Sequence, residues 1–587
     1  MTIKRLILSL LTLLAIYFAG VSLWASWKQP QIQSRLELYE TNLQLQASQW
    51  QPPEGAEGNL SARKALLGEK PLELATAQYQ AARESAQQNL QKAQTQLQEL
   101  RSQPASTPTA PKPQSDIAPT TDTSRLRQQK LAQKSITQLE KFIAELDLQL
   151  GILQAEQGKI DAALKTWEGV RKKEKSEVGV ETQNFAQLGV ETRDLAQLGV
   201  ETRNLAQLGV ETRNFASVQK SEVPSQIENP KSKIHASTAT DLVETANVLI
   251  GLWSDPARLL PNAQQVIQTN LDGWFRDRAL VRLYQLQQRQ AALEELQADI
   301  QAAAEQALVK RAIIGSIPAI AGLTGLGLII FVVTQRLRKG KESLLAQNED
   351  TTWETPWTGE TVWQVFIVGF FLMGQLLIPL TLQLLNFRPI NAGVRIQAFY
   401  VLINYLLLAL GGLGVLYLSI KSFFPLPKDW FRLNWRGNWW LWGLGGYCVA
   451  WPLVFLVSVI NQQLWQGQGG SNPLLSLALE AQDRVALGIF FFTAAIAAPF
   501  FEEFLFRGFL LPSLTRYLPV WGAILLSALL FAVAHLSLSE ILPLAVLGIV
   551  LGVVYTRSRN LLAPMLLHSL WNSGTLLSLF ILGSGSS

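Results

Sequence analysis

Long apolar runs almost free of charged residues are the feature that most constrains the fold of this 587-residue chain. A helix crosses the hydrocarbon core of a bilayer, about 30 Å thick, with about 20 apolar residues. Inside that core every backbone polar group needs an internal hydrogen bond, which a helix provides. The sequence therefore predicts an all-α, polytopic helical membrane protein.

About nine apolar runs are candidates for membrane helices, one at the N-terminus and the others after residue 310. We expect residues 1–27 to form an uncleaved N-terminal anchor, with a cleaved signal peptide as the competing interpretation. The predicted spans are 6–24, 312–334, 362–385, 396–420, 437–460, 484–501, 518–535, 541–555 and 561–582.

The charged and sulfur-containing residues exclude several classes of protein. The chain has 50 Lys and Arg against 45 Asp and Glu, a formal charge of only +5, so no nucleic-acid partner is expected. Its single cysteine, Cys448, cannot build a disulfide framework or a CxxC metal or redox pair. Low charge together with 18 Trp and 25 Phe favours a protein whose main environment is the lipid bilayer.

Lys and Arg alternate between rich and poor loops along the spans, as the positive-inside rule requires. With a cytoplasmic N-terminus, the basic residues of the inner loops are Arg336, Arg338, Lys339, Lys341, Lys421, Lys428, Arg432, Arg436, Arg507, Arg516, Arg557 and Arg559. The short outer loops hold only Arg388, Arg395 and Arg484. This pattern predicts a multi-pass protein of the plasma (inner) membrane or another energy-transducing membrane, with residues 28–310 outside the cytoplasm.

The extracytoplasmic region 28–310 is predicted to be mostly helical, with a coiled-coil character in part. Ala75–Leu100 is rich in Ala, Gln, Glu and Leu and predicts one long helix. Residues 102–124 form a Pro/Ser/Thr-rich linker, and residues 178–218 hold low-complexity decapeptide repeats with a glycine every ten residues. Ordered helices are expected to resume from residue 239.

Residues 135–172 are the part of this region with a candidate binding motif. The residues at the offsets of a tetratricopeptide repeat are Leu150, Gly151, Gly158, Ala163 and Trp167. One such unit is weak evidence, because at least three repeats are usually needed for a stable stack. A TPR-like surface for a protein partner and a plain helical hairpin both stay open.

Polar side chains inside the last spans are the candidate chemistry. Residues 311–361 hold the second span and a cytoplasmic linker, and residues 362–483 hold additional membrane helices. An ionisable side chain at the bilayer centre costs at least about 2.5 to 3.5 kcal/mol, so it marks a functional site by default. The candidates within residues 484–582 are Glu502, Glu503, Arg507, His535, His568 and Asn572.

Helical spacing predicts how these side chains face one another. Glu503 and Arg507 are four residues apart, so the guanidinium can neutralise that carboxylate. Glu502 is turned by about 100° and is expected to be unpaired at the inner end of the sixth span. His568 and Asn572 share one face by the same spacing. We expect three helices to bring these groups to one shared cavity.

Three short motifs carry a resemblance to a known family. They are EEFLFR at 502–507, FAVAH at 531–535 and HSLWN at 568–572. In this order, on separate predicted membrane helices, they resemble the EExxxR, FxxxH and HxxxN motifs of the CPBP family. That family comprises the CAAX protease and bacteriocin-processing (Abi) intramembrane endopeptidases. The resemblance covers residues 484–582, about a sixth of the chain.

The resemblance implies hydrolysis of peptide bonds of membrane-associated protein or peptide substrates. Such a reaction needs a base for water, a stabiliser for the oxyanion and a proton donor for the leaving amine. Glu502 is the candidate base, and Glu503 is a second catalytic candidate. Arg507 is expected to hold Glu503, and Phe531 is expected to act as a packing residue.

Two mechanisms stay open for the remaining residues. In a glutamate-dependent mechanism, His535 and His568 orient the water or polarise the scissile carbonyl, and Asn572 donates to the oxyanion. In a metal-dependent mechanism, Glu502, His535 and His568 bind Zn²⁺. The sequence lacks an HExxH motif, so the cofactor is either zinc or none.

Two other functions compete with the protease. Buried Glu and His also serve as proton relays in transporters, although the spans show no evident internal duplication. A non-catalytic membrane scaffold with a partner-binding outer region is the third hypothesis. The nature of the substrate, including whether it is prenylated, is not predicted by any residue pattern in the chain.

Overall fold

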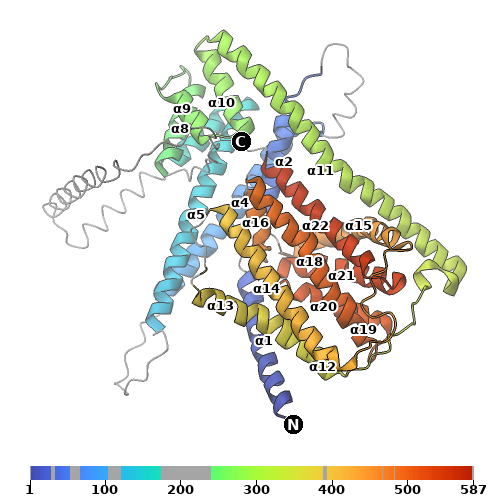
Figure 1. Cartoon of the computed structure of the whole chain (residues 1–587). Coiled ribbons are helices and arrows are strands. Elements are labelled where there is room, and N and C mark those ends of the chain that lie inside the picture. The colour runs from blue at the N-terminus through green and yellow to red at the C-terminus, as the bar shows by residue number, and fades with distance from the viewer. Residues whose placement is uncertain are drawn as a thin grey trace, which may run out of the picture. The chain divides into compact units, whose positions relative to one another are not determined.

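The computed structural model describes residues 2–27, 33–52, 67–102, 121–172, 239–385, 387, 393–465, 467–480 and 483–584. These residues are mostly helical and contain no β-strand (Figure 1). The decapeptide repeats and most of the 102–124 linker lie outside the described residues. The chain divides into two compact units, one made of Met1–Glu69 with Ala302–Ser587 and one made of Lys70–Gln301.

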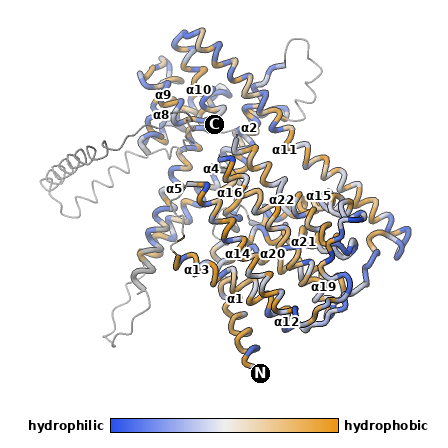
Figure 2. Tube along the Cα trace, viewed as in Figure 1, coloured by the Kyte–Doolittle hydropathy of each residue, from blue (hydrophilic) through white to orange (hydrophobic). Residues whose placement is uncertain are grey.

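The first unit contains the membrane helices. Eight helical stretches of the described chain are long and apolar enough to cross a bilayer, and they colour as hydrophobic in Figure 2. They are α1 (Ile3–Trp27), α11 (Gln290–Lys339), the stretch of α12 (Gly359–Gln364), η4 (Val365–Leu377) and α13 (Ile378–Leu384), α14 (Val394–Ile420), α15 (Trp439–Trp465), the stretch Arg484–Leu514, α21 (Leu538–Ser558) and α22 (Leu562–Gly583).

The seventh expected span is shorter than its sequence prediction. It forms α20 (Val520–Val533), whose 14 residues extend about 21 Å at 1.5 Å per residue. Its flanking segments nevertheless contact different ends of the unit. Thr515 accepts a hydrogen bond from the Trp353 amide, whereas Leu538 donates its amide to Ser26 at the far end of α1. The expected alternation of nine segments is therefore compatible with eight full-length helices and one short helix.

Four loops assigned to the inner side lie together at one end of this unit. Arg516 donates to the backbone oxygens of Thr355 and Trp357, and Arg559 donates to that of Thr351. Trp430 donates to the Glu354 oxygen from the loop after α14. The grouping of these loops follows the positive-inside prediction. Their cytoplasmic location stays a prediction.

The sixth span differs from its prediction in length and in content. It continues to Leu514 through α17 (Arg484–Phe491), η6 (Phe492–Ala497), α18 (Ala498–Glu503), η7 (Phe504–Leu510) and α19 (Leu511–Leu514), where η6 and η7 are π-helical. The placement of Glu502 at the inner end of the span and of Arg507 in an inner loop was wrong. Arg507 is completely buried, because its charge is neutralised inside the helix by Glu503.

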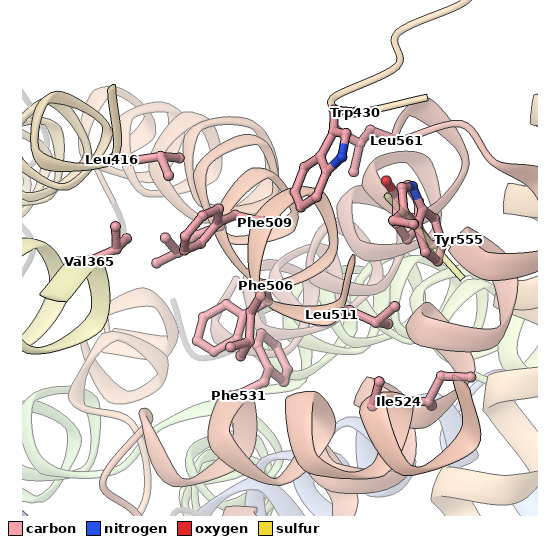
Figure 3. Close-up of a cluster of buried hydrophobic side chains, with 14 of the residues drawn as sticks. Val365, Leu416, Trp430, Phe506, Phe509, Leu511, Ile524, Phe531, Tyr555 and Leu561 are labelled. Atoms are coloured by element: carbon pink, nitrogen blue, oxygen red, sulfur yellow. The ribbon is translucent and has the colours of Figure 1, made fainter. Parts of the chain in front are cut away.

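Aromatic packing fixes the helices around this irregular span. Phe506 and Phe531 meet edge to face with ring centroids 5.4 Å apart, and Figure 3 shows them beside Phe509 and Leu511. Phe531 is fully buried in this cluster, as expected for its packing role. The cluster holds η7 against α20, which places the carboxylates of α18 inside the bundle.

The polar segment between the first two spans belongs to both units. Helix α2 (Gln33–Ser48) packs with α22 in the membrane unit, within a cluster that includes Leu43 and Leu579. In the second unit α4 (Pro71–Ser102) and α5 (Thr121–Glu156) form an antiparallel pair, because Gln157 donates to Leu72 and Gln129 donates to Leu100. The long helix expected over 75–100 is thus present.

The candidate TPR-like segment forms a helical hairpin. Helix α5 ends at a turn in which Gly158 has a φ of +78°, and a second helix covers 160–172. The indole of Trp167 packs on Gly151, where a side chain would collide with it, and donates to the Leu148 oxygen at 3.0 Å. Helices α8 (Ala239–Trp253), α9 (Ala263–Asn270) and α10 (Gly273–Leu286) complete the unit.

Candidate active site

Glu503, Arg507 and His568 form one hydrogen-bonded group in the interior of the membrane unit. Oε1 of Glu503 accepts from Arg507 Nη1 at 2.9 Å and lies 2.8 Å from His568 Nδ1. The side chains of Glu503 and Arg507 are 0% exposed, and that of His568 is 4% exposed. The expected Glu503–Arg507 pair is therefore formed, and the histidine joins it from α22.

Close packing of two helices gives Arg507 two further contacts, although its Nε is buried without a hydrogen-bond partner among the described residues. Arg507 Nη2 donates to the Gly548 oxygen at 3.2 Å, and its guanidinium lies over Phe531 at 4.5 Å. A Cβ on Gly548 would approach Ala528 to 2.9 Å, so a glycine lets α21 come this near to α20. A buried arginine needs such partners, because an unpaired charge in an apolar interior is strongly destabilising.

Glu502 occupies a different environment from its neighbour. Its side chain is 16% exposed, and its Oε1 accepts from the Tyr405 hydroxyl at 3.1 Å. Its other oxygen, Oε2, is buried without a hydrogen-bond partner among the described residues and lies 4.0 Å from His568 Nε2. One water molecule can bridge such a separation. Glu502 was expected to be unpaired. Its Oε1 does have a hydrogen-bond partner, whereas its Oε2 has none among the described residues.

His568 is oriented by the fully buried carboxylate. Because a carboxylate only accepts hydrogen bonds, the contact with Glu503 assigns the N–H of His568 to Nδ1. The Nε2 side of the ring is then directed toward Glu502. A histidine whose tautomer is set by a carboxylate on one nitrogen is a recurring device of catalytic sites.

His535 contacts the site through Phe531. Its Nδ1 lies 2.9 Å from the Phe531 backbone oxygen, and its ring is 4.9 Å from the Phe531 ring centroid. Phe531 also meets His568 edge to face at 5.7 Å. The FxxxH motif thus places one aromatic ring between two histidines. No direct hydrogen bond joins His535 to Glu502 or His568 in the part of the chain that the structure describes.

Asn572 lies on the same face of α22 as His568. Its Nδ2 donates at 2.7 Å to the oxygen of Ala494, in the π-helical segment η6. A π-helical turn leaves backbone groups available, and such turns are frequent at functional sites. The contact orients the amide and leaves its second N–H for another acceptor.

The three candidate zinc ligands are not brought together as a metal-holding group among the described residues. Catalytic zinc takes three protein ligands, and Glu502 and His568 provide two donors 4.0 Å apart. His535, the third candidate, hydrogen-bonds a backbone oxygen through Nδ1, which leaves its Nε2 available, as in metal-binding histidines. Across the described residues no group of three His, Cys, Asp or Glu side chains is placed to hold a metal.

Tyr405 is the residue that the sequence analysis missed. It lies in α14, 97 positions before Glu502, and outside the three motifs. A tyrosine near the middle of an apolar span that holds two others is the one available signal, and it is weak because tyrosine is also an ordinary packing residue. Its ring also meets Phe501 edge to face at 6.1 Å, which fixes its direction.

Comparison with known proteins finds similarity in the part of the chain that holds the three motifs. Residues 484–574 match the family model for Type II CAAX prenyl endopeptidase Rce1-like proteins. The chain is also similar to the membrane-embedded CAAX protease MroQ of Staphylococcus aureus (strain USA300), with 27% identity over 137 residues. That alignment covers 22% of this chain and 54% of the relative, so it spans about half the length of that protein. No solved structure matches the chain.

The comparisons confirm the family resemblance read from the three motifs. Both support a CAAX protease family for the C-terminal membrane segment. They leave the individual catalytic residues and the role of a metal untested. The second unit, Lys70–Gln301, lies outside the matched residues 484–574.

Proposed function

We propose that this chain, whose residues 484–574 belong to the CPBP family of CAAX proteases, is an intramembrane endopeptidase that uses Glu502 to activate water. Its substrates are membrane proteins or peptides. The observation that carries the proposal is the free Oε2 of Glu502, buried and 4.0 Å from His568 Nε2. A water between these atoms has a carboxylate to accept its proton and an imidazole to orient it.

The two glutamates have different surroundings, and we assign them different roles on that basis. Glu503 is held by Arg507 and His568 through Oε1, so its charge is balanced and its role is to fix the ring of His568. Its Oε2 also has no hydrogen-bond partner among the described residues. Among the described residues, the hydrogen-bond partner of Glu502 is the neutral hydroxyl of Tyr405. Only the Oε2 of Glu502 lies near the free ring nitrogen of His568, which favours Glu502 for contact with the attacking water.

The reaction follows from these positions. Glu502 takes a proton from water through Oε2 while the water oxygen attacks the scissile carbonyl carbon. His568 Nε2 accepts a hydrogen bond from the remaining O–H, whose hydrogen stays on the attacking oxygen. The tetrahedral oxyanion needs hydrogen-bond donors, which typically supply about 3 to 4 kcal/mol each. The remaining N–H of Asn572 is such a donor. His535 donates from Nε2 only as an imidazolium, because its Nδ1–H already faces a backbone oxygen.

The carboxyl group of Glu502 also completes the reaction. Protonated Glu502 delivers its proton to the leaving nitrogen as the C–N bond breaks, which regenerates the carboxylate and releases an amine and a carboxylic acid. Zinc would polarise the carbonyl and the water when bound. Every step described here uses only the side chains of this chain.

The test compares membrane proteomes from cells that produce the wild type, Glu502→Gln, His568→Ala or Glu342→Gln. Glu342 is exposed at the end of the short 3-10 helix Gly340–Glu342 and has no role in the proposed site, so its variant controls for loss of a carboxylate. We expect cleavage products in the wild type and Glu342→Gln and none in the other two. Unchanged products in all four would refute the protease.

The same strains test the transporter alternative. A proton relay through Glu502 and His568 would make proton-coupled uptake disappear in both variants while cleavage products stay unchanged. The proposed protease predicts the opposite pattern, with cleavage lost and uptake retained.

A further inference from the structure

A cavity in the second unit lies outside the proposed protease site. It has a volume of about 330 Å³, which is within the range of sites that bind small ligands or side chains. Its lining residues are Ala155, Glu156, Ile160, Trp253, Arg278, Val281, Arg282 and Gln285. All of them belong to the unit Lys70–Gln301, which the family match does not cover.

One helix face provides the polar wall of this cavity. Arg278, Arg282 and Gln285 recur along α10 at intervals of four and three residues, so they lie on the same side of the helix. Ala155, Glu156 and Ile160 come from the helical hairpin opposite, and Trp253 ends α8. The cavity is therefore formed where three helical segments converge.

The charges in the cavity are unequal. Arg278 pairs with Glu156 at 2.6 Å and also lies over Trp274, so its charge is balanced. Arg282 donates from Nε to the Leu252 oxygen at 3.3 Å. No carboxylate pairs with Arg282 in the part of the chain that the structure describes. Two arginines and one glutamate leave one positive charge in a half-buried cavity.

The opposite wall is apolar and rigid. Trp253 is buried, and its ring lies 5.4 Å from the Trp167 ring, which anchors it to the hairpin. Ile160 adds aliphatic surface beside it, and Val281 adds more from α10. An incoming side chain can thus lay its methylene groups on this wall while its end group reaches the guanidinium of Arg282.

We propose that this cavity binds an acidic side chain of an extended peptide segment from a partner protein. The guanidinium of Arg282 has the planar donor geometry that matches a carboxylate, and the Arg278–Glu156 pair can open to give a second donor. The proposal does not depend on peptide hydrolysis by the membrane unit.

The test uses two pools of random hexapeptides, one with a fixed central glutamate and one with a fixed glutamine. Both pools are offered to the full-length protein in detergent, in the Glu502→Gln background so that no peptide is cut. Bound peptides are counted by mass spectrometry. We expect the glutamate pool to be enriched about fivefold, as one charge-assisted hydrogen bond at a half-exposed site predicts. Equal recovery of both pools would overturn the proposal.

Three variants test whether any enrichment of the glutamate peptides depends on the cavity. Arg282→Gln should abolish it, and Glu156→Gln should raise it about two- to fivefold by freeing Arg278. Lys165→Gln removes a positive charge from an exposed position of the same unit and should leave it unchanged. A purely structural role of these residues would not move binding in opposite directions. Enrichment that survives Arg282→Gln contradicts the assignment.

One further variant and one competing compound complete the test. If Arg282→Gln does not fold, Arg282→Lys keeps the charge without the planar donors and should bind at an intermediate level. N-acetylglutamate is added at the peptide concentration to separate a peptide from a free carboxylate. Displacement of the peptides by this compound would overturn the peptide assignment, and retention of the peptides supports it.

Discussion

Two arginine–glutamate pairs of the same chemistry occupy opposite environments in this protein. In the membrane unit, Arg507 and Glu503 are 2.9 Å apart and 0% exposed. In the second unit, Arg278 and Glu156 are 2.6 Å apart with side chains 35% and 20% exposed. The shorter distance belongs to the more exposed pair. Distance alone therefore does not indicate what each pair contributes.

Burial decides the role of each pair. Two charges removed from water lose solvation, so each partner of the buried pair becomes indispensable to the other. The half-buried pair of the second unit keeps contact with water, so opening it costs less. We infer that the membrane pair is a fixed support for His568, whereas the second pair can open for a ligand.

The largest predicted effect is the loss of one partner from the buried pair. Arg507→Met should lower the free energy of unfolding by about 3 to 5 kcal/mol, because it leaves the Glu503 carboxylate uncompensated. Thermal unfolding of the purified protein in detergent, with Arg338→Met as the exposed control, measures this effect. A loss below 1 kcal/mol would show that the two pairs are equivalent, and the comparison would fail.

Replacing both partners should separate stability from activity. The double variant Glu503→Leu/Arg507→Met should regain about 2 to 4 kcal/mol over Arg507→Met alone, since two apolar side chains need no solvation. It should stay inactive, because His568 has lost the carboxylate that orients its ring. Recovery of cleavage by the double variant would contradict the proposed role of Glu503.

A smaller effect is expected at Tyr405. Tyr405→Phe removes one neutral hydrogen bond to Glu502, so kcat should fall about tenfold, the factor for roughly 1.4 kcal/mol. Stability should change little because the ring stays in place. Tyr417→Phe, at an exposed position of the same helix, is the matched control. Equal activity of the two variants would show that Tyr405 does not contribute to catalysis.

The smallest effect is expected from the exposed pair. Arg278→Gln should lower the free energy of unfolding by less than about 1 kcal/mol, and the difference should shrink further in 1 M salt. The Arg507→Met effect should depend much less on salt, because buried charges are weakly screened. Urea unfolding at two salt concentrations gives both values, and a strong salt dependence at Arg507 would argue against its burial.

The sequence predicted those features that depend on neighbouring residues. Helical spans follow from run length and hydropathy, and the Glu503–Arg507 pair follows from a spacing of four residues. The end of the sixth span was predicted wrongly, because two glutamates in an apolar run indicate a helix end when their partners are unknown. The partners that keep these residues inside the helix are His568 and Tyr405, which lie on α22 and α14.

Contacts between residues far apart in the sequence could be identified only from the fold. Glu503 and His568 are 65 positions apart, and only the order of the motifs suggested their meeting. The hydroxyl of Tyr405 and the carbonyl of Ala494 belong to no motif at all. The cavity beside Arg282 was equally inaccessible, since its walls come from residues 155–160, 253 and 278–285.

The most direct test of the central claim follows oxygen from water into a cleaved peptide. Purified protein is reconstituted in vesicles with membrane proteins as substrates, the reaction is run in H₂¹⁸O, and new C-termini are identified by mass spectrometry. We expect one ¹⁸O in each new carboxyl group with the wild type and no new termini with Glu502→Gln. Equal numbers of labelled termini from both proteins would contradict the assignment of Glu502 as the base.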